Sequence, residues 1–150
     1  MKTIKRILLI LILTAVGMVP VSAHMFSGNN WTWLYSDSEV SVYLGRYYYD
    51  VDRDQLSCYL GYRYPAQNSC RVEFTTFDYY YKTYIVTYIK EYDDRGHELD
   101  AYNTNAGWED VEANDGTFMG MLMQKAADNS SRDYQLLYYD PRTHPHKSHK

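Results

Sequence analysis

The middle of the chain alternates large apolar side chains with polar or small ones. This period of two is typical of β-strands, in which successive side chains point to opposite faces. Five segments show the pattern: residues 31–35, 40–44, 55–62, 71–75 and 83–92. The links between them are short, which favours antiparallel neighbours, because a parallel pair needs a long crossover. We therefore expect an antiparallel, meander-like sheet of about five to six strands.

A helical period replaces the alternation later in the chain. Phe118, Leu122 and Ala126 recur at four-residue spacing, so a helix would carry them on one apolar stripe. Asn114 or Asp115 can cap the start of this helix. Together the two patterns predict an α+β fold, in which one C-terminal α-helix packs against the antiparallel β-sheet.

The segment at residues 89–102 holds five carboxylates and a histidine, which suits either a reactive centre or a hairpin tip. Aspartates favour the first positions of a turn, and Gly96 can take the positive φ that closes a type I turn with a bulge. A calcium loop centred on Gly96 would need Arg95 as a ligand, and arginine cannot ligate a cation. We therefore expect residues 93–96 to form a solvated turn between two strands.

A second acidic stretch has the spacing of the first three ligands in a calcium loop. Asp50, Asp52 and Asp54 supply these positions, but Gln55 replaces the glycine and Gly61 the closing glutamate that the loop requires. An acidic turn is the favoured interpretation, with a weak ion site as the alternative. We predict no metal site from these residues.

The beginning of the chain has the order of a secretory signal peptide. Lys2, Lys5 and Arg6 precede the apolar run 7–16, and small residues lead up to Ala23. The apolar run is well short of the roughly twenty residues that cross a bilayer. We therefore predict a signal peptide at residues 1–23, cleaved after Ala23, and a protein that is exported to the periplasm, to the cell surface or out of the cell.

The mature chain would keep 127 residues, which is enough for one domain. We divide it into a short lead at 24–29, a single domain at 30–128, and a flexible tail at 129–150. Removing the three cations of the signal peptide lowers the formal net charge from −4 to −7. An acidic chain has no general attraction for nucleic acid or anionic lipid, so these partners are not expected.

Export also changes how the two cysteines are interpreted. Outside the cytosol, Cys58 and Cys70 are candidates for a disulfide, because the oxidising environment favours a bridge over a catalytic pair. Such a bridge would stabilise the fold by roughly 3 kcal/mol. Spacing alone does not show that the two Cβ atoms meet, so free thiols stay open as the alternative.

Two runs of three tyrosines stand out among the 18 tyrosines of the chain. Three successive side chains of an extended segment cannot all face a core, so at least one ring in each run points outward. Tyrosine is common at binding surfaces, where its ring supplies area and its hydroxyl a hydrogen bond. The alternative is that the rings only shield their own sheet. The candidate partner-binding residues are Tyr47, Tyr48, Tyr49, Tyr79, Tyr80 and Tyr81.

The last ten residues combine prolines, cations and three histidines, His144, His146 and His149. This composition cannot build a core and predicts a flexible, solvated tail. Loose chelation of zinc, nickel or copper is the alternative.

Sequence motifs of enzymes are missing from the chain. It has no Gly-x-Ser-x-Gly elbow, no phosphate-binding glycine loop and no His-Glu-x-x-His zinc motif. We therefore predict that the protein is not an enzyme and uses no cofactor. A small secreted hydrolase stays open as a less favoured alternative, because glycosidase carboxylates have no short motif.

The order of these signals, from about Asn30 to Asp128, resembles that of the surface-adhesin protein E family of exported bacterial proteins. The matching pieces are residues 30–34 (NWTWL), 42–43, 84–99, Trp108 and 118–127. The resemblance implies a small antiparallel sheet backed by a helix, and a non-enzymatic role at the cell envelope, which in some members is binding of host extracellular-matrix proteins. The match covers framework positions and so implies no binding residue.

We therefore expect an exported, adhesin-like binding protein that acts at the cell envelope or outside the cell. A host-matrix or envelope protein is the expected kind of partner. The alternative function is a periplasmic protein that binds a small ligand or a metal.

Overall fold

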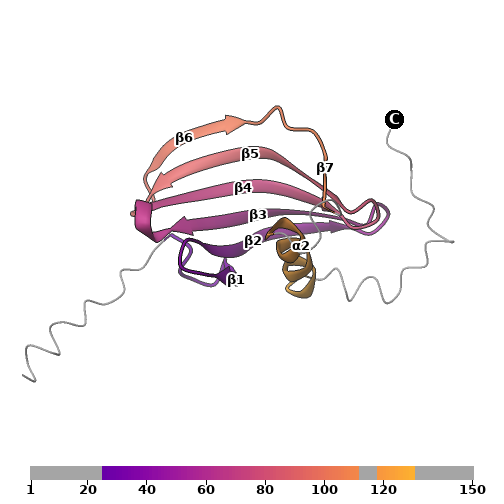
Figure 1. Cartoon of the computed structure of the whole chain (residues 1–150), viewed down its shortest axis with the longest axis horizontal. Coiled ribbons are helices and arrows are strands. Elements are labelled where there is room, and N and C mark those ends of the chain that lie inside the picture. The colour runs from indigo at the N-terminus through magenta and orange to yellow at the C-terminus, as the bar shows by residue number, and fades with distance from the viewer. Residues whose placement is uncertain (1–24, 112–117, 131–150) are drawn as a thin grey trace, which may run out of the picture.

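The computed structural model describes residues 25–111 and 118–130. Six strands follow one another as a meander, each antiparallel to the strand before it (Figure 1). They are β1 (Thr32–Ser36), β2 (Ser41–Asp50), β3 (Gln55–Tyr64), β4 (Ser69–Asp78), β5 (Thr83–Asp93) and β6 (Glu98–Asn103). A short strand, β7 (Glu109–Asp110), also pairs with β5. The helix α2 (Phe118–Asp128) lies on one face of the sheet, so the predicted α+β fold is confirmed.

Turn chemistry explains the hairpin between β5 and β6. The Asp93 carboxylate accepts hydrogen bonds from the backbone N–H of Arg95 at 2.9 Å and of His97 at 2.8 Å. Gly96 adopts a φ of +86°, which favours glycine because a side chain rarely tolerates it. These bonds lower the pKa of Asp93, with the backbone bond from His97 as the largest cause. The prediction of a hairpin tip at residues 93–96 is confirmed.

The acidic stretch after β2 is also a turn. The Asp54 carboxylate is buried and accepts a 2.6 Å hydrogen bond from the hydroxyl of Tyr49, while Asp50 forms an ion pair with Arg53 at 3.8 Å. Within the described part of the chain, no three His, Cys, Asp or Glu side chains come together as a metal site would require. The carboxylates at 50 and 54 therefore serve the turn that joins β2 to β3.

The hydrophobic core lies between the sheet and α2. Each large side chain buried there contributes roughly 1.5–3 kcal/mol relative to an exposed one. Its buried members include Leu34, Val42, Leu44, Leu56, Leu60, Phe77, Leu122 and Ala126. A hydrogen bond from the Tyr79 hydroxyl to the backbone carbonyl of Met123, at 2.8 Å, ties α2 to the turn after β4.

The opposite face of the sheet is partly covered by residues 25–31. Phe26 is 2% exposed, stacks on Tyr43 at a ring-centroid distance of 5.3 Å and contacts Trp31 edge-on at 4.7 Å. Two glycines make room for these rings. A Cβ on Gly61 would lie 2.5 Å from the Phe26 ring, and one on Gly45 would lie 2.7 Å from the Trp31 ring. The segment that the sequence suggests as a short lead therefore includes a fully packed side chain.

No helix in the described ranges is long and apolar enough to cross a bilayer. Residues 1–24 lie outside the described residues, and with them the predicted signal peptide.

Candidate functional site

The structure separates the first tyrosine run into three environments. Tyr49 is 6% exposed and bonded to Asp54, Tyr48 is 69% exposed, and Tyr47 lies between them in exposure at 39%. In the second run, Tyr79 is partly buried, and its hydroxyl donates a hydrogen bond to the backbone carbonyl of Met123. Tyr80 and Tyr81 are exposed and contact each other edge-on at 4.8 Å. At least one ring in each run therefore points outward, as the spacing predicts.

The cysteine prediction needs correction, because both thiols are free and buried. Cys58 pairs with Thr75 in the β3–β4 ladder, whereas Cys70 pairs with Arg63. These rungs are five residues apart, or roughly 17 Å along the strands, and the two side chains point to opposite faces. A disulfide needs Cα atoms within about 7 Å. Burial raises the pKa of Cys58 to about 12 and that of Cys70 to about 11, so both stay protonated at neutral pH.

The histidines of the C-terminal tail lie outside the described residues, so the alternative of loose metal binding stays a prediction.

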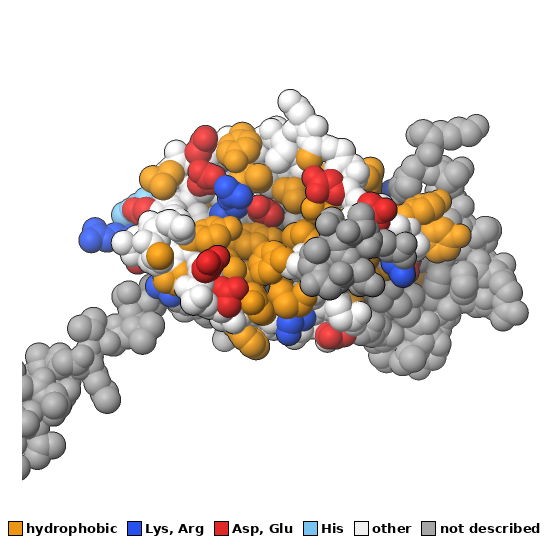
Figure 2. All heavy atoms as spheres, in the orientation of Figure 1, with side chains coloured by type: hydrophobic (Ala, Val, Ile, Leu, Met, Phe, Trp, Pro, Cys, Tyr) orange, Lys and Arg blue, Asp and Glu red, His pale blue; other side chains and the backbone are white. Residues whose placement is uncertain are grey.

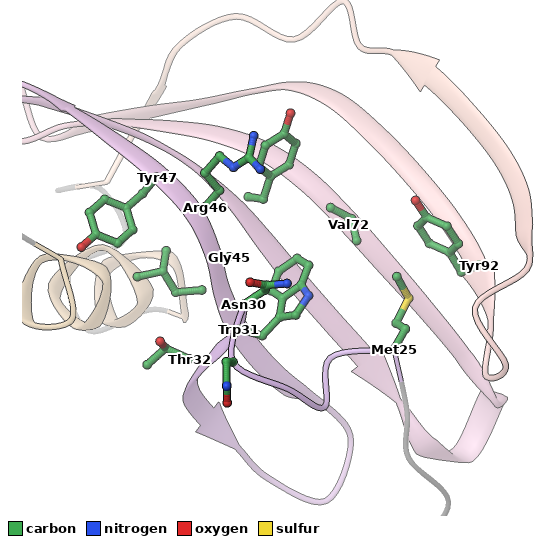
Figure 3. A pocket seen from close by; sticks show the side chains of 12 residues that line it. Met25, Asn30, Trp31, Thr32, Gly45, Arg46, Tyr47, Val72 and Tyr92 are labelled. Carbon is green, nitrogen blue, oxygen red and sulfur yellow. The ribbon is translucent and has the colours of Figure 1, made fainter.

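A groove of about 650 Å³ lies on the face of the sheet opposite α2 (Figure 3). Its lining comes from the N-terminal segment, from the first residue of β1 and from strands β2 to β5. The residues that shape it are Trp31, Gly45, Arg46, Tyr59, Val72 and Tyr92. Figure 3 shows Tyr92 and Met25 at one end of the groove and Tyr47 at the other. Tyr47 is the one member of the predicted tyrosine runs that the structure brings to this groove.

A β-bulge in β2 builds the middle of the groove. Leu44 pairs with Leu60, but the next pairing is Tyr47 with Cys58, so two residues of β2 oppose one residue of β3. Bulges re-aim side chains and bend a strand. The two residues of β2 that form the bulge are Gly45 and Arg46. The side chain of Arg46 extends from the bulge along the groove (Figure 3). Under strict alternation the Arg46 side chain would point to the same face as Leu44. Because of the bulge, it points to the face that holds the groove.

The indole of Trp31 forms one wall of the groove. It lies against Gly45, where even a methyl side chain would collide with the ring. Phe26 also supports the indole, through an edge-on contact with a ring-centroid distance of 4.7 Å. The wall is therefore held by packing, although it comes from a segment outside the regular strands.

The electrostatics of the groove depend on Arg46. It is the only charged side chain among the described residues of the lining, and it makes no ion pair or hydrogen bond with any residue in the described ranges.

Burial raises the pKa of Tyr92, an effect that the nearby charge of Lys90 opposes. The Tyr92 hydroxyl therefore keeps its proton at neutral pH and can donate a hydrogen bond.

A second polar cluster lies on the helix side of the sheet, where hydrophobic side chains gather with charged ones among them (Figure 2). Arg71 pairs with Glu73 at 3.5 Å and with Glu91 at 3.1 Å. Burial raises the pKa of Glu73, while Arg71 and a hydrogen bond from Tyr62 act in the opposite direction. Because these charges satisfy one another, the cluster has less capacity to bind a ligand than the groove with its unpaired cation.

Sequence reasoning missed the groove. The tyrosine runs drew attention because they are conspicuous, whereas Trp31, Arg46, Tyr59 and Tyr92 are far apart in the chain. One local signal was present. Gly45 and Arg46 interrupt the apolar alternation of β2, as a glycine in a strand often does at a bulge.

No protein-family model matches the chain, and no curated protein or solved structure matches it either. The resemblance to the surface-adhesin protein E family therefore stays a prediction from the order of sequence signals.

Proposed function

We propose that the protein is an exported, non-enzymatic, adhesin-like binding protein that captures its ligand in the groove on the open face of the sheet. It acts at the cell envelope or outside the cell. The observation that carries the proposal is the combination of three aromatic residues, Trp31, Tyr59 and Tyr92, with the unpaired Arg46 in one groove.

The construction of the groove favours binding. Its floor is made of paired strands, so the side chains are held in place before a ligand arrives and little ordering entropy is lost on binding. The volume of about 650 Å³ lies within the roughly 300–1,000 Å³ that is usual for ligand sites. Aromatic side chains with a few polar groups are the usual lining of such sites.

The lining also explains why we propose binding and not catalysis. Its described residues include no carboxylate, imidazole or thiol. General acid–base and nucleophilic catalysis depend mainly on these groups. A guanidinium and neutral hydroxyls can hold a ligand, but they are poor proton-transfer groups at neutral pH.

A second candidate is a periplasmic protein that binds a small ligand in the same groove. The groove volume, which is large enough for a small molecule, favours this function. Both candidates predict the same contact residues and differ in where the ligand resides.

Retention of extracted material tests the proposal. We expect the immobilised protein to retain components of envelope or host-matrix extracts, and Tyr59→Ser to abolish most of this retention. Tyr80→Ser is the matched control, because Tyr80 is exposed but lies outside the groove. Both variants are first compared with the parent by thermal unfolding.

Equal retention by the parent and Tyr59→Ser would overturn the proposal, whether or not Tyr80→Ser loses retention. Retention of a low-molecular-weight component alone would favour the periplasmic alternative. Fractionation of the producing cell into periplasm, membrane and medium then shows in which compartment the protein acts.

A further inference from the structure

We propose that the ligand of the groove is an acidic sugar, that is, a saccharide ring that carries a carboxylate or sulfate group. This inference rests on the proposed function and names the class of ligand. Arg46 would bind the oxyanion, and the aromatic rings would pack on the sugar.

Charge complementarity is the first argument. The chain is acidic, with a formal net charge of −4, yet the described lining of the groove contains a cation and no acid. Elsewhere the arginines of the sheet are neutralised, as in the pairs Arg71–Glu91 and Arg63–Asp94. A planar guanidinium can donate two parallel hydrogen bonds to a carboxylate or sulfate. An unpaired Arg46 at the bulge therefore selects an anionic group.

The aromatic lining is the second argument. The C–H groups of a sugar ring form an apolar face, which packs well on the face of an aromatic side chain. Trp31, Tyr59 and Tyr92 supply such rings in the same groove as Arg46. The side chains of Asn29 and Asn30 also line the groove, and an amide can both donate to and accept from sugar hydroxyls.

The sheet pairing argues against an extended peptide. A peptide that adds to a sheet needs a free strand edge for its backbone hydrogen bonds. The strands below the groove, β2 to β5, are paired on both edges, so their backbone groups are already used. A ligand on this face must be recognised by side chains, which suits a sugar with many hydroxyls.

A nucleic acid is disfavoured for a different reason. Its affinity depends on several cations that neutralise successive phosphates, and the described lining has only one. A single anionic substituent next to a ring matches the single guanidinium better.

The test is an NMR titration that follows the indole N–H of Trp31. The probes are a hexasaccharide of alternating glucuronic acid and N-acetylglucosamine, its carboxyl-reduced neutral form, and a sulfated counterpart of that neutral form. The two acidic probes show whether the site takes a carboxylate, a sulfate or both. We expect acidic probes to bind at least about 10-fold more tightly than the neutral one, because charge-assisted hydrogen bonds are the stronger kind.

Arginine variants test which residue makes the contact. Arg46→Gln is expected to lower the affinity for the acidic probes by about 10-fold or more. Its affinity for the neutral probe should equal that of the parent. Arg46→Lys should retain part of the affinity, since lysine keeps the charge but not the bidentate geometry. Arg53→Gln is the control, because it changes the net charge equally on a turn outside the groove.

The outcomes separate the ligand class from the proposed function. Equal affinity for acidic and neutral probes, or no effect of Arg46→Gln, would overturn the acidic-sugar inference. If Tyr59→Ser still abolishes retention of extracted material, the binding function stands and only the ligand class is wrong. If no groove variant changes retention, the proposed function itself fails.

Discussion

At the scale of single residues, neighbours in one tyrosine run have different tasks. Tyr49 holds the turn after β2 through Asp54, Tyr48 faces solvent, and Tyr47, which pairs with the core residue Cys58, borders one end of the groove. The sequence could predict that the rings do not all face the core, because that follows from the geometry of an extended chain. It could not predict which ring faces where, because the bulge at Gly45 and Arg46 changes the alternation just before the run.

Removing the Tyr49 hydroxyl should destabilise the fold. We expect Tyr49→Phe to lower the free energy of unfolding by roughly 1–3 kcal/mol, since the buried Asp54 carboxylate loses a hydrogen bond. Tyr48→Phe is the control, because that hydroxyl belongs to an exposed side chain. Urea unfolding at pH 7 measures both. Equal stability of the two variants would show that the Tyr49–Asp54 bond contributes nothing.

The raised pKa of Glu73 predicts that the free energy of unfolding depends on pH. Burial raises its pKa in the folded protein above the ordinary value of 4.5. The folded state then holds a proton that the unfolded state releases first, so stability is lost as the pH rises from about 4.5 through the folded pKa. The variant Glu73→Gln has no titratable group at this position, so its stability lacks this contribution to the pH dependence.

We therefore expect the free energy of unfolding of the parent, relative to Glu73→Gln, to fall between acidic and neutral pH. Urea unfolding across this range measures the difference. A difference that is constant, or that changes in the opposite direction, would show that Arg71 and Tyr62 outweigh the burial of the carboxyl.

At the scale of elements, alternation was enough to predict five of the strands, a helical period predicted the helix, and turn residues predicted the hairpin at 93–96. The short strand β7 was not predicted. Alternation failed where packing between distant segments decides the structure. Residues 25–31 have no regular period, yet they cover the sheet because Gly45 and Gly61 leave room for two rings. The free cysteines have the same origin, since strand register places Cys58 and Cys70 on opposite faces.

The contact of Phe26 with β3 can be tested directly. In Gly61→Ala, the new methyl group would lie 2.5 Å from the Phe26 ring, and the ring cannot move away without losing its burial. We expect a loss of roughly 1–3 kcal/mol in unfolding free energy, as is typical of overpacking. Gly107→Ala is the matched control, because a Cβ there meets nothing within 4 Å. Equal stability of the two variants would mean that residues 25–31 do not pack on the sheet.

At the scale of the whole molecule, the sheet has two faces with different roles. The helix side holds the core under α2, whereas the other side holds the groove between the N-terminal segment and strands β2 to β5. Among the described lining residues Arg46 is the one cation, and it makes no ion pair there, which is why we propose that the groove binds a single anionic group. The groove could not be predicted from the sequence, because it needs the register of four strands and the position of residues 25–31.

The most direct test of the central claim is hydroxyl-radical footprinting of the protein, alone and bound to the extracted material that it retains. Tyrosine and tryptophan side chains react readily with hydroxyl radicals. The reactivity of the groove residues and of the exposed tyrosines is therefore measured in the same experiment. The account predicts protection of Trp31, Tyr59 and Tyr92, and unchanged reactivity of Tyr80 and Tyr81. Protection confined to Tyr80 and Tyr81, with the groove residues unchanged, would contradict it.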